Sequence, residues 1–219
     1  MDAGLAIEQL EFNVINVKSS DDYTLKPVFT MLSVSGGLVE NRFYLTANID
    51  NSLFDANLDG AVAAGDKDTL SRSDRSLTLG YYIKNNVSVF VGYLTGDTED
   101  AYSSPLYNET GTISFTEKGP FAGANYLLYF SKGALSLNFA YALLKGESEV
   151  TYKIGPASDK TLYKGDTSGI SLGAKYVGQW MQNINYYIGG KINLFKFDAT
   201  SFNTKENFYI AQAGVTYKF

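Results

Sequence analysis

Large apolar or aromatic side chains alternate with small or polar ones along many segments of this 219-residue sequence. Between residues 135 and 143, Leu, Leu, Phe, Tyr and Leu take every second position, and Ser, Asn, Ala and Ala lie between them. A period of two predicts a β-strand whose two faces meet different surroundings. The same alternation marks residues 76–83, 87–93, 170–176, 184–194 and 209–219.

The alternating segments are joined by connections of two unequal kinds. Short polar turns, which predict tight hairpins, begin at Gly36, Lys84, Ser131 and Trp180. Long polar segments join the other ends of the strands. Short turns at one end and long loops at the other are typical of outer-membrane barrels. We therefore expect residues 1–219 to form one barrel domain, with long extracellular loops at about 50–73, 96–119, 146–166 and 198–205.

A soluble β-sandwich or lipocalin also has strands with one apolar face, so the two classes must be separated. The alternating segments here are long enough to cross a bilayer at a tilt, which takes ~9–11 residues. Their polar faces carry Gly, Ser, Asn and Ala, which suit a narrow polar interior, and aromatic residues gather beside the short turns. These features favour an all-β, transmembrane, antiparallel up-and-down barrel.

Composition excludes several other classes. The sequence holds no apolar run long enough for a transmembrane helix. Its formal net charge of −5 argues against nucleic acid as a partner, since that ligand demands a basic surface. Cysteine is absent, which excludes disulfides and thiolate metal sites.

The C-terminal segment resembles the terminal strand of Gram-negative outer-membrane barrels. Tyr209, Tyr217 and the final Phe219 lie on one face of an alternating segment, as in the signal that the barrel-insertion machinery reads. The resemblance is to the class of small barrels that includes the OmpX, OmpW and opacity-type proteins. It implies location in the bacterial outer membrane, contact with outer-membrane lipid and lipopolysaccharide, and a monomer.

The number of strands follows from the connections. Four short turns supply eight strands and the C-terminal segment adds one, but barrels of this class have an even number. Residues 10–14 supply another strand, with Leu10, Phe12 and Val14 on the face opposite Glu11 and Asn13. We therefore predict ten strands. The alternative is eight strands with residues 1 to about 38 as an extension.

The alternation also predicts which charged side chains face the interior. Glu11, Arg42, Lys175 and Lys191 fall on the inward face. We interpret them as a network of ion pairs that fills the lumen, because a charge facing lipid at mid-bilayer costs ~2–4 kcal/mol. The other interpretation is a selective path for small solutes.

Residues 55–66 match the spacing of a calcium-binding loop. Asp55, Asn57, Asp59 and Asp66 would supply side-chain oxygens, and the carbonyl of Ala61 would be a further ligand for Ca²⁺. The segment resembles EF-hand and dockerin-type loops, although no flanking helices are evident and Asp66 stands where Glu is usual. The alternative is a solvated acidic loop that matches by chance.

Histidine is absent from the sequence. The familiar outer-membrane enzymes resemble one another in using a His as base or proton carrier, so we expect that this chain is not an enzyme. The acidic loops favour a structural or surface-interaction protein with a mostly filled lumen. A narrow, porin-like channel or transporter for small or hydrophobic solutes is the alternative, and it is favoured by inward apolar side chains at Phe90, Leu94, Phe195 and Phe197.

Overall fold

The computed structural model describes residues 2–16, 23–57, 65–199 and 202–217, and its regular structure there consists of antiparallel strands. In these ranges no helix is long and apolar enough to span a membrane. The strands are β1 (Asp2–Asn16), β2 (Tyr23–Leu25), β3 (Val28–Glu40), β4 (Phe43–Ser52), β5 (Ala56–Asn57), β6 (Lys67–Lys84), β7 (Val87–Ser104), β8 (Glu109–Phe130), β9 (Gly133–Ile154), β10 (Ala157–Gln179), β11 (Ile184–Ala199) and β12 (Phe202–Tyr217).

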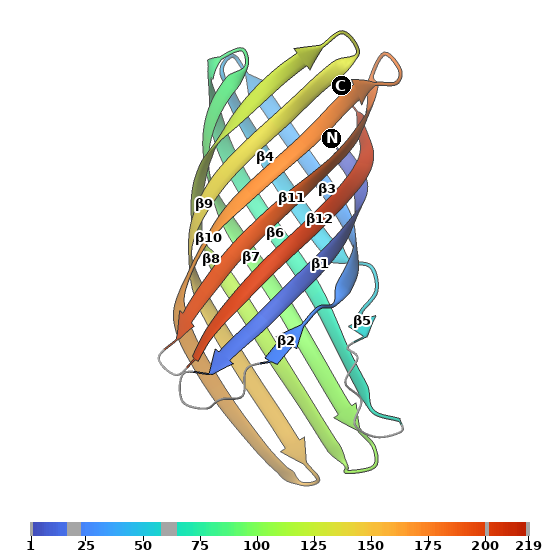
Figure 1. Ribbon diagram of the computed structural model, residues 1–219, viewed down its shortest axis with the longest axis vertical. Helices are drawn as coiled ribbons and strands as arrows, with labels where there is room; N and C mark the ends of the chain where they lie inside the picture. The colour runs from blue at the N-terminus through green and yellow to red at the C-terminus, as the bar shows by residue number, and fades with distance from the viewer. Residues whose placement is uncertain (1, 17–22, 58–64, 200–201, 218–219) are drawn as a thin grey trace.

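Figure 1 shows that the strands form a closed, tilted barrel. Each long strand pairs with its neighbour in sequence, and β1 pairs with β12 to close the wall, for example at Leu5 and Ala213. The short strands β2 and β5 are additions, paired with β1 and β6. The barrel thus has ten strands, which confirms the predicted fold, and β1 and β3 belong to its wall and not to an extension.

One end of the barrel carries the predicted tight turns. They lie between β3 and β4, β6 and β7, β8 and β9, and β10 and β11. The first of them is at residues 41–42 and not at Gly36, because β3 continues to Glu40 and Asn41 takes the left-handed backbone conformation, with φ 56°. The chain enters β1 and leaves β12 at this short-turn end.

The opposite, long-hairpin end differs from prediction. Most of residues 96–119 and 146–166 are strand and not loop, and the turns between them are only 105–108 and 155–156. Asn108 and Gly155 have positive φ angles of 51° and 56° at these turns, a conformation that Asn and Gly adopt more readily than other residues. Likewise β11 continues to Ala199, and β6 already begins at Lys67. The hairpins of β7 with β8 and of β9 with β10 project past the rest of the wall (Figure 1).

Their outer faces explain why these hairpins looked like loops. Inside the bilayer the outer face of a strand must be apolar, but beyond it the same face meets water and turns polar. On β9, for example, Phe139, Tyr141 and Leu143 face outward and are followed on the same face by Lys145 and Glu147. The alternation between inward and outward side chains therefore continues beyond the belt, but the outward side chains there are polar and not apolar.

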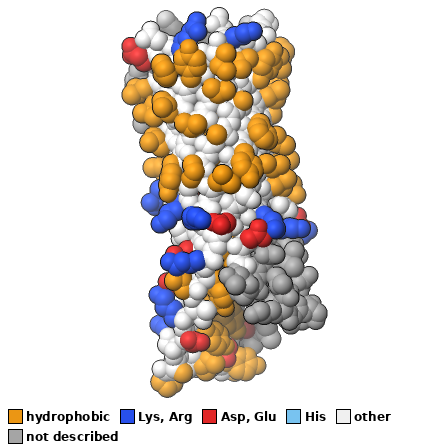
Figure 2. Space-filling model, turned by 90° about the vertical axis from the view of Figure 1, so that its left-hand side faces the viewer, with side chains coloured by type: hydrophobic (Ala, Val, Ile, Leu, Met, Phe, Trp, Pro, Cys, Tyr) orange, Lys and Arg blue, Asp and Glu red, His pale blue; other side chains and the backbone are white. Residues whose placement is uncertain are grey.

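An apolar belt surrounds the barrel near the short-turn end. Figure 2 shows it on one face as a broad band of hydrophobic side chains, bounded by a row of charged ones toward the long-hairpin end. Large hydrophobic side chains that would be buried in a soluble protein are exposed there. They include Leu5, Ile7, Leu38, Leu77, Leu79, Val91, Leu143, Leu172 and Ile188, with exposed fractions of 48% or more.

Candidate functional site

A buried arginine lies in the interior, on β6. Leu70, Arg72 and Asp74 share the inward face of this strand because they lie at every second position. The Arg72 side chain is 3% exposed. On the outer face of β6 the apolar belt begins at Leu77, so Arg72 lies just beyond the belt toward the long-hairpin end.

The Arg72 guanidinium is held by hydrogen bonds from several strands. Its Nε and Nη2 donate to the two carboxylate oxygens of Asp74, both at 2.9 Å. Nη2 also donates to Oε1 of Glu117 on β8 at 3.3 Å, and Nη1 donates to the Thr98 hydroxyl on β7 at 2.8 Å. Paired donors fit the planar guanidinium well and fix its orientation.

Two more carboxylates and an aromatic ring complete the surroundings of Arg72. Glu8 on β1 and Glu206 on β12 each place an oxygen 3.9 Å from a guanidinium nitrogen. The Phe208 ring centre lies 4.2 Å from Cζ of Arg72, at cation–π distance. We call Arg72, Glu8, Glu117, Glu206 and Phe208 the Arg72 layer.

The Arg72 layer lies across the barrel interior. Its members come from β1, β6, β8 and β12, and all of them are at most 5% exposed. Phe29 and Leu10, which are 0% and 1% exposed, belong to the apolar cluster that contains Phe208. The side chains of the layer are thus closely packed around a fixed guanidinium at this level of the interior.

Charge in the layer is unbalanced. Four carboxylates, those of Glu8, Asp74, Glu117 and Glu206, surround one guanidinium. Oε2 of Glu117 and Oε2 of Glu206 are buried and have no hydrogen-bond partner within the described ranges. Because a buried charge without a partner is costly, the layer depends strongly on Arg72.

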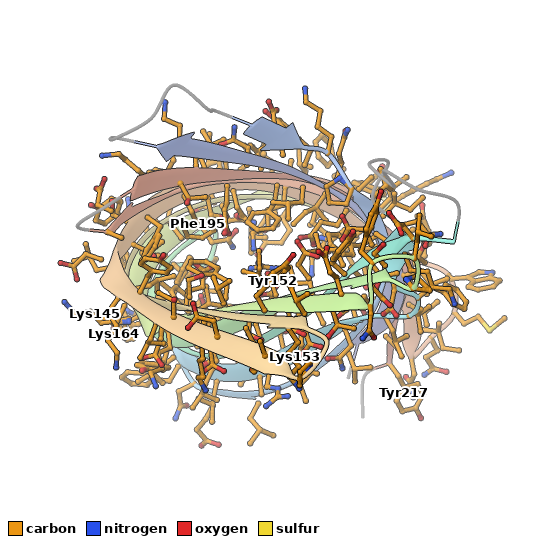
Figure 3. The ribbon with its side chains drawn as sticks, turned by 90° about the horizontal axis from the view of Figure 1, so that it is seen from below. Lys145, Tyr152, Lys153, Lys164, Phe195 and Tyr217 are labelled. Carbon is orange, nitrogen blue, oxygen red and sulfur yellow. The ribbon has the colours of Figure 1, made fainter. Side chains whose placement is uncertain are left out.

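A cavity of about 450 Å³ lies beside the layer, lined by polar side chains of the lumen together with Lys175 and Lys191. Nζ of Lys175 lies 5.1 Å from the centre of the Tyr187 ring. Phe90, Leu94 and Phe195 supply part of the apolar lining; the Phe195 label in Figure 3 lies within the ring of strands. The hydroxyl and amide lining includes Ser33, Thr46, Asn48, Ser76, Thr78, Asn125, Ser136, Asn138, Ser171 and Gln212.

The structure separates the four charged residues that were expected in the lumen. Lys175 and Lys191 line the cavity. Glu11 lies on the face of β1 opposite Leu10, and its Oε1 is 3.5 Å from Nζ of Lys26. Arg42 lies in the exposed turn between β3 and β4. The inward face of β1 was misassigned because apolar residues there, such as Leu10, pack inside the barrel and do not face lipid.

The predicted calcium loop lies only partly within the described residues. Asp55 precedes β5, Asn57 belongs to it, and Asp66 immediately precedes β6. Asp59 and Ala61 lie outside the described residues. No cluster of three or more acidic, His or Cys side chains suited to a metal occurs in the described part of the chain. Calcium binding by residues 55–66 therefore stays a prediction.

The described residues of the expected insertion signal lie on the outer face of β12. Tyr209 and Tyr217 face outward on β12 and are 42% and 44% exposed. Phe219 lies outside the described residues. The two tyrosines thus belong to the outer face of the strand, and their reading by insertion machinery stays a prediction.

A pair of aspartates faces inward near the long-hairpin end. Asp68 on β6 and Asp100 on β7 lie diagonally on the same face, two residue pairs apart along the ladder. Burial, a hydrogen bond with Asp68 and its charge raise the pKa of Asp100 to about 7. Two close carboxylates favour sharing one proton. The pair was missed because its segments were assigned to loops.

Solved structures with this fold are outer-membrane barrels. The outer membrane protease OmpT from Escherichia coli aligns with a TM-score of 0.73 at 12% identity, covering 100% of this chain and 96% of that chain. The translocator domain of the autotransporter NalP from Neisseria meningitidis gives 0.45 at 9% identity, over 100% and 88%. Ail of Yersinia pestis gives 0.40 at 9%, over 98% and 97%. No family model and no curated protein sequence matches the chain.

The likeness to OmpT corrects one expectation. From the absence of His we expected that this chain is not an enzyme, yet its barrel is one that a protease shares. That expectation was wrong, because the absence of one residue type does not show that a barrel with the fold of a protease is not an enzyme. At 12% identity the likeness concerns the fold alone.

Proposed function

We propose that this outer-membrane barrel acts at the cell surface as an interaction protein, through the hairpins that project from its long-hairpin end. The observation that carries the proposal is the Arg72 layer, whose side chains are at most 5% exposed and whose packing would close the lumen. A closed interior leaves the projecting strands as the part that meets the surroundings. In barrels of this class the end with the longer connections is extracellular.

The tips of two hairpins offer a surface for such contacts. Leu106 and Tyr107, in the turn between β7 and β8, are 68% and 55% exposed. Tyr152 and Ile154, at the end of β9, are 40% and 48% exposed. The amide of Gly155 donates to the carbonyl of Asn108 at 3.0 Å, which holds the two turns together. We call these four side chains the tip surface.

Exposed aromatic and apolar groups of this kind are enriched where proteins bind other proteins. The tip surface lies on strands that pair without interruption from Glu109 with Ile154 to Lys118 with Lys145. A rigid platform lowers the entropy cost of binding. The proposed partner is therefore a protein surface that contributes apolar contacts.

The test is adhesion by cells that carry the barrel. Cells with the unchanged protein should bind one another or protein-coated plates above the level of cells without it. Leu106→Ser, Tyr107→Ser and Ile154→Ser together should return binding to that level, whereas Leu53→Ser with Phe54→Ser, also exposed, should not. Unchanged adhesion by the tip variant, with folded protein confirmed by its heat-dependent gel mobility, would reject the proposal.

A channel is the second candidate, favoured by the cavity of about 450 Å³ with Lys175 and Lys191. It requires that the Arg72 layer open, so that small or hydrophobic solutes pass. Two of the contacts to Arg72 are long, at 3.9 Å, which is the feature that supports this candidate. Ion conductance separates the two proposals.

A further inference from the structure

Lysines form a row at the edge of the apolar belt. On β8 the outward-facing Pro120 is followed, toward the long-hairpin end, by Lys118, and on β9 Leu143 is followed by Lys145. On β11 and β12, Lys196 and Lys205 take the corresponding outer positions beyond Leu194 and Tyr209. Figure 2 shows part of this row just beyond the band of hydrophobic side chains.

These lysines face each other in pairs. Lys118 is the direct cross-strand partner of Lys145, and Lys196 is that of Lys205. Like charges directly opposite each other destabilise a sheet. The arrangement therefore costs free energy in the isolated barrel unless an anion lies between the two ammonium groups.

Among the described residues, only one lysine of each pair forms an ion pair with a carboxylate of the wall. Asp166 on β10 forms an ion pair with Lys145, and Asp198 on β11 forms one with Lys196, at 2.6 Å. Lys118 and Lys205 are exposed and make no ion pair with any residue in the described ranges. Each lysine pair thus has one member that forms no ion pair within these ranges.

The directly opposed lysines lie on β8 with β9 and on β11 with β12. At comparable outer positions β1, β3, β4 and β7 carry the uncharged side chains of Gln9, Thr30, Ile49 and Thr95, and β6 carries Arg75. Further from the belt on β9 and β10, Lys164 pairs with Glu147 at 2.9 Å. Figure 3 shows Lys145 and Lys164 on the outside of the wall.

We propose that each of the two lysine pairs, Lys118 with Lys145 and Lys196 with Lys205, binds a phosphate group of a lipid headgroup in the outer leaflet. The pairs lie where the apolar belt ends, which is the height of lipid headgroups. A phosphate accepts charge-assisted hydrogen bonds from two ammonium groups at once and removes their repulsion. Basic side chains at this height are attracted to anionic lipid.

The probe is lipid A that carries both phosphates, added to the folded barrel in neutral detergent, with bound lipid counted by native mass spectrometry. Lys118→Gln and Lys205→Gln remove the two lysines that have no acidic partner, so the ion pairs of the wall remain. Lys153→Gln, at the exposed tip of β9, is the control with the same loss of charge. Dephosphorylated lipid A and inorganic phosphate are the reference ligands.

We expect the dissociation constant for diphosphorylated lipid A to rise about fivefold for each removed lysine, since such a side chain contributes ~1 kcal/mol near an anionic surface. Lys153→Gln should leave it unchanged, and dephosphorylated lipid A should bind the unchanged protein as weakly as it binds the double variant. Equal loss from Lys153→Gln would reduce the effect to net charge and overturn the proposal. Displacement of the lipid by equimolar inorganic phosphate would assign the lysines to free anions and overturn it as well.

Discussion

Arg72 is the residue on which the interior of the barrel depends most. It is the counter-charge for four buried or partly buried carboxylates. One of them lies on its own strand, β6, and the other three lie on β1, β8 and β12. Alternation of side chains places Lys175 and Lys191 inside, but it says nothing about which inward residues meet. Glu8, Glu117 and Glu206 lie far from Arg72 in sequence, so their contact with it depends on strand order and register. That information was not available from the pattern of single strands.

Replacement of Arg72 should therefore destabilise the barrel strongly. We expect Arg72→Met to lower the free energy of unfolding by about 3–5 kcal/mol, because it leaves buried carboxylates without a counter-charge. Urea unfolding in lipid vesicles, followed by the fluorescence of Trp180, the single tryptophan, measures this change. Arg75→Met, on the exposed outer face of the same strand, is the control and should change it by at most ~0.5 kcal/mol. Equal effects of the two variants would contradict the role given to Arg72.

Asp100 should make stability depend on pH. Burial and the neighbouring Asp68 raise the pKa of Asp100 from 3.8 to about 7, so the folded protein keeps a proton that the unfolded chain has lost. Stability from this group is then present below pH 3.8 and declines as pH rises toward about 7. Asp100→Asn should flatten this decline between about pH 4.5 and about pH 8, measured by urea unfolding. Glu99→Gln, on the outer face, should leave the decline of stability with rising pH unchanged. If the decline persists in Asp100→Asn, other groups cause it.

At the scale of elements, the sequence predicts strands well and their lengths poorly. All ten barrel strands contain a segment in which apolar and polar residues alternate, since the belt requires an apolar outer face. Beyond the belt that requirement ends, and segments such as 109–118 read as polar loops although they continue β8. Pro120 lies within this strand, where the β8–β9 ladder skips from Lys118 with Lys145 to Phe121 with Ala142.

The segment from 55 to 66 gives a prediction about calcium. If it binds Ca²⁺, the ion should order the connection ahead of β6 and slow cleavage by trypsin after Lys67. Removal of the metal with a chelator should restore cleavage, and Asp55→Asn with Asp59→Asn should abolish protection. The measurement is the rate of cleavage in folded, detergent-solubilised protein at millimolar calcium. A rate that does not respond to calcium would leave the match to a calcium-loop pattern as coincidence.

At the scale of the whole molecule, the apolar belt and the hairpins that project beyond it are the two parts of the barrel to which we assign a role. The belt fixes it in a membrane, with lysines at one edge, and the strands beyond the belt carry the tip surface. Membrane location and the closed barrel could be predicted from the sequence, because they follow from alternation along each strand. A mostly filled lumen was also predicted, but the side chains that fill it were not identified, because those of β1, β6, β8 and β12 meet only across the interior.

The most direct test of this account is the ion conductance of the folded protein in a planar lipid bilayer. The Arg72 layer predicts that the unchanged barrel inserts without discrete conductance steps. Arg72→Ser together with Glu117→Ser and Glu206→Ser, which removes three of the four charged side chains of the layer, should produce small and reproducible steps. Reproducible steps from the unchanged, fully folded protein would contradict a closed lumen and make the channel its primary function.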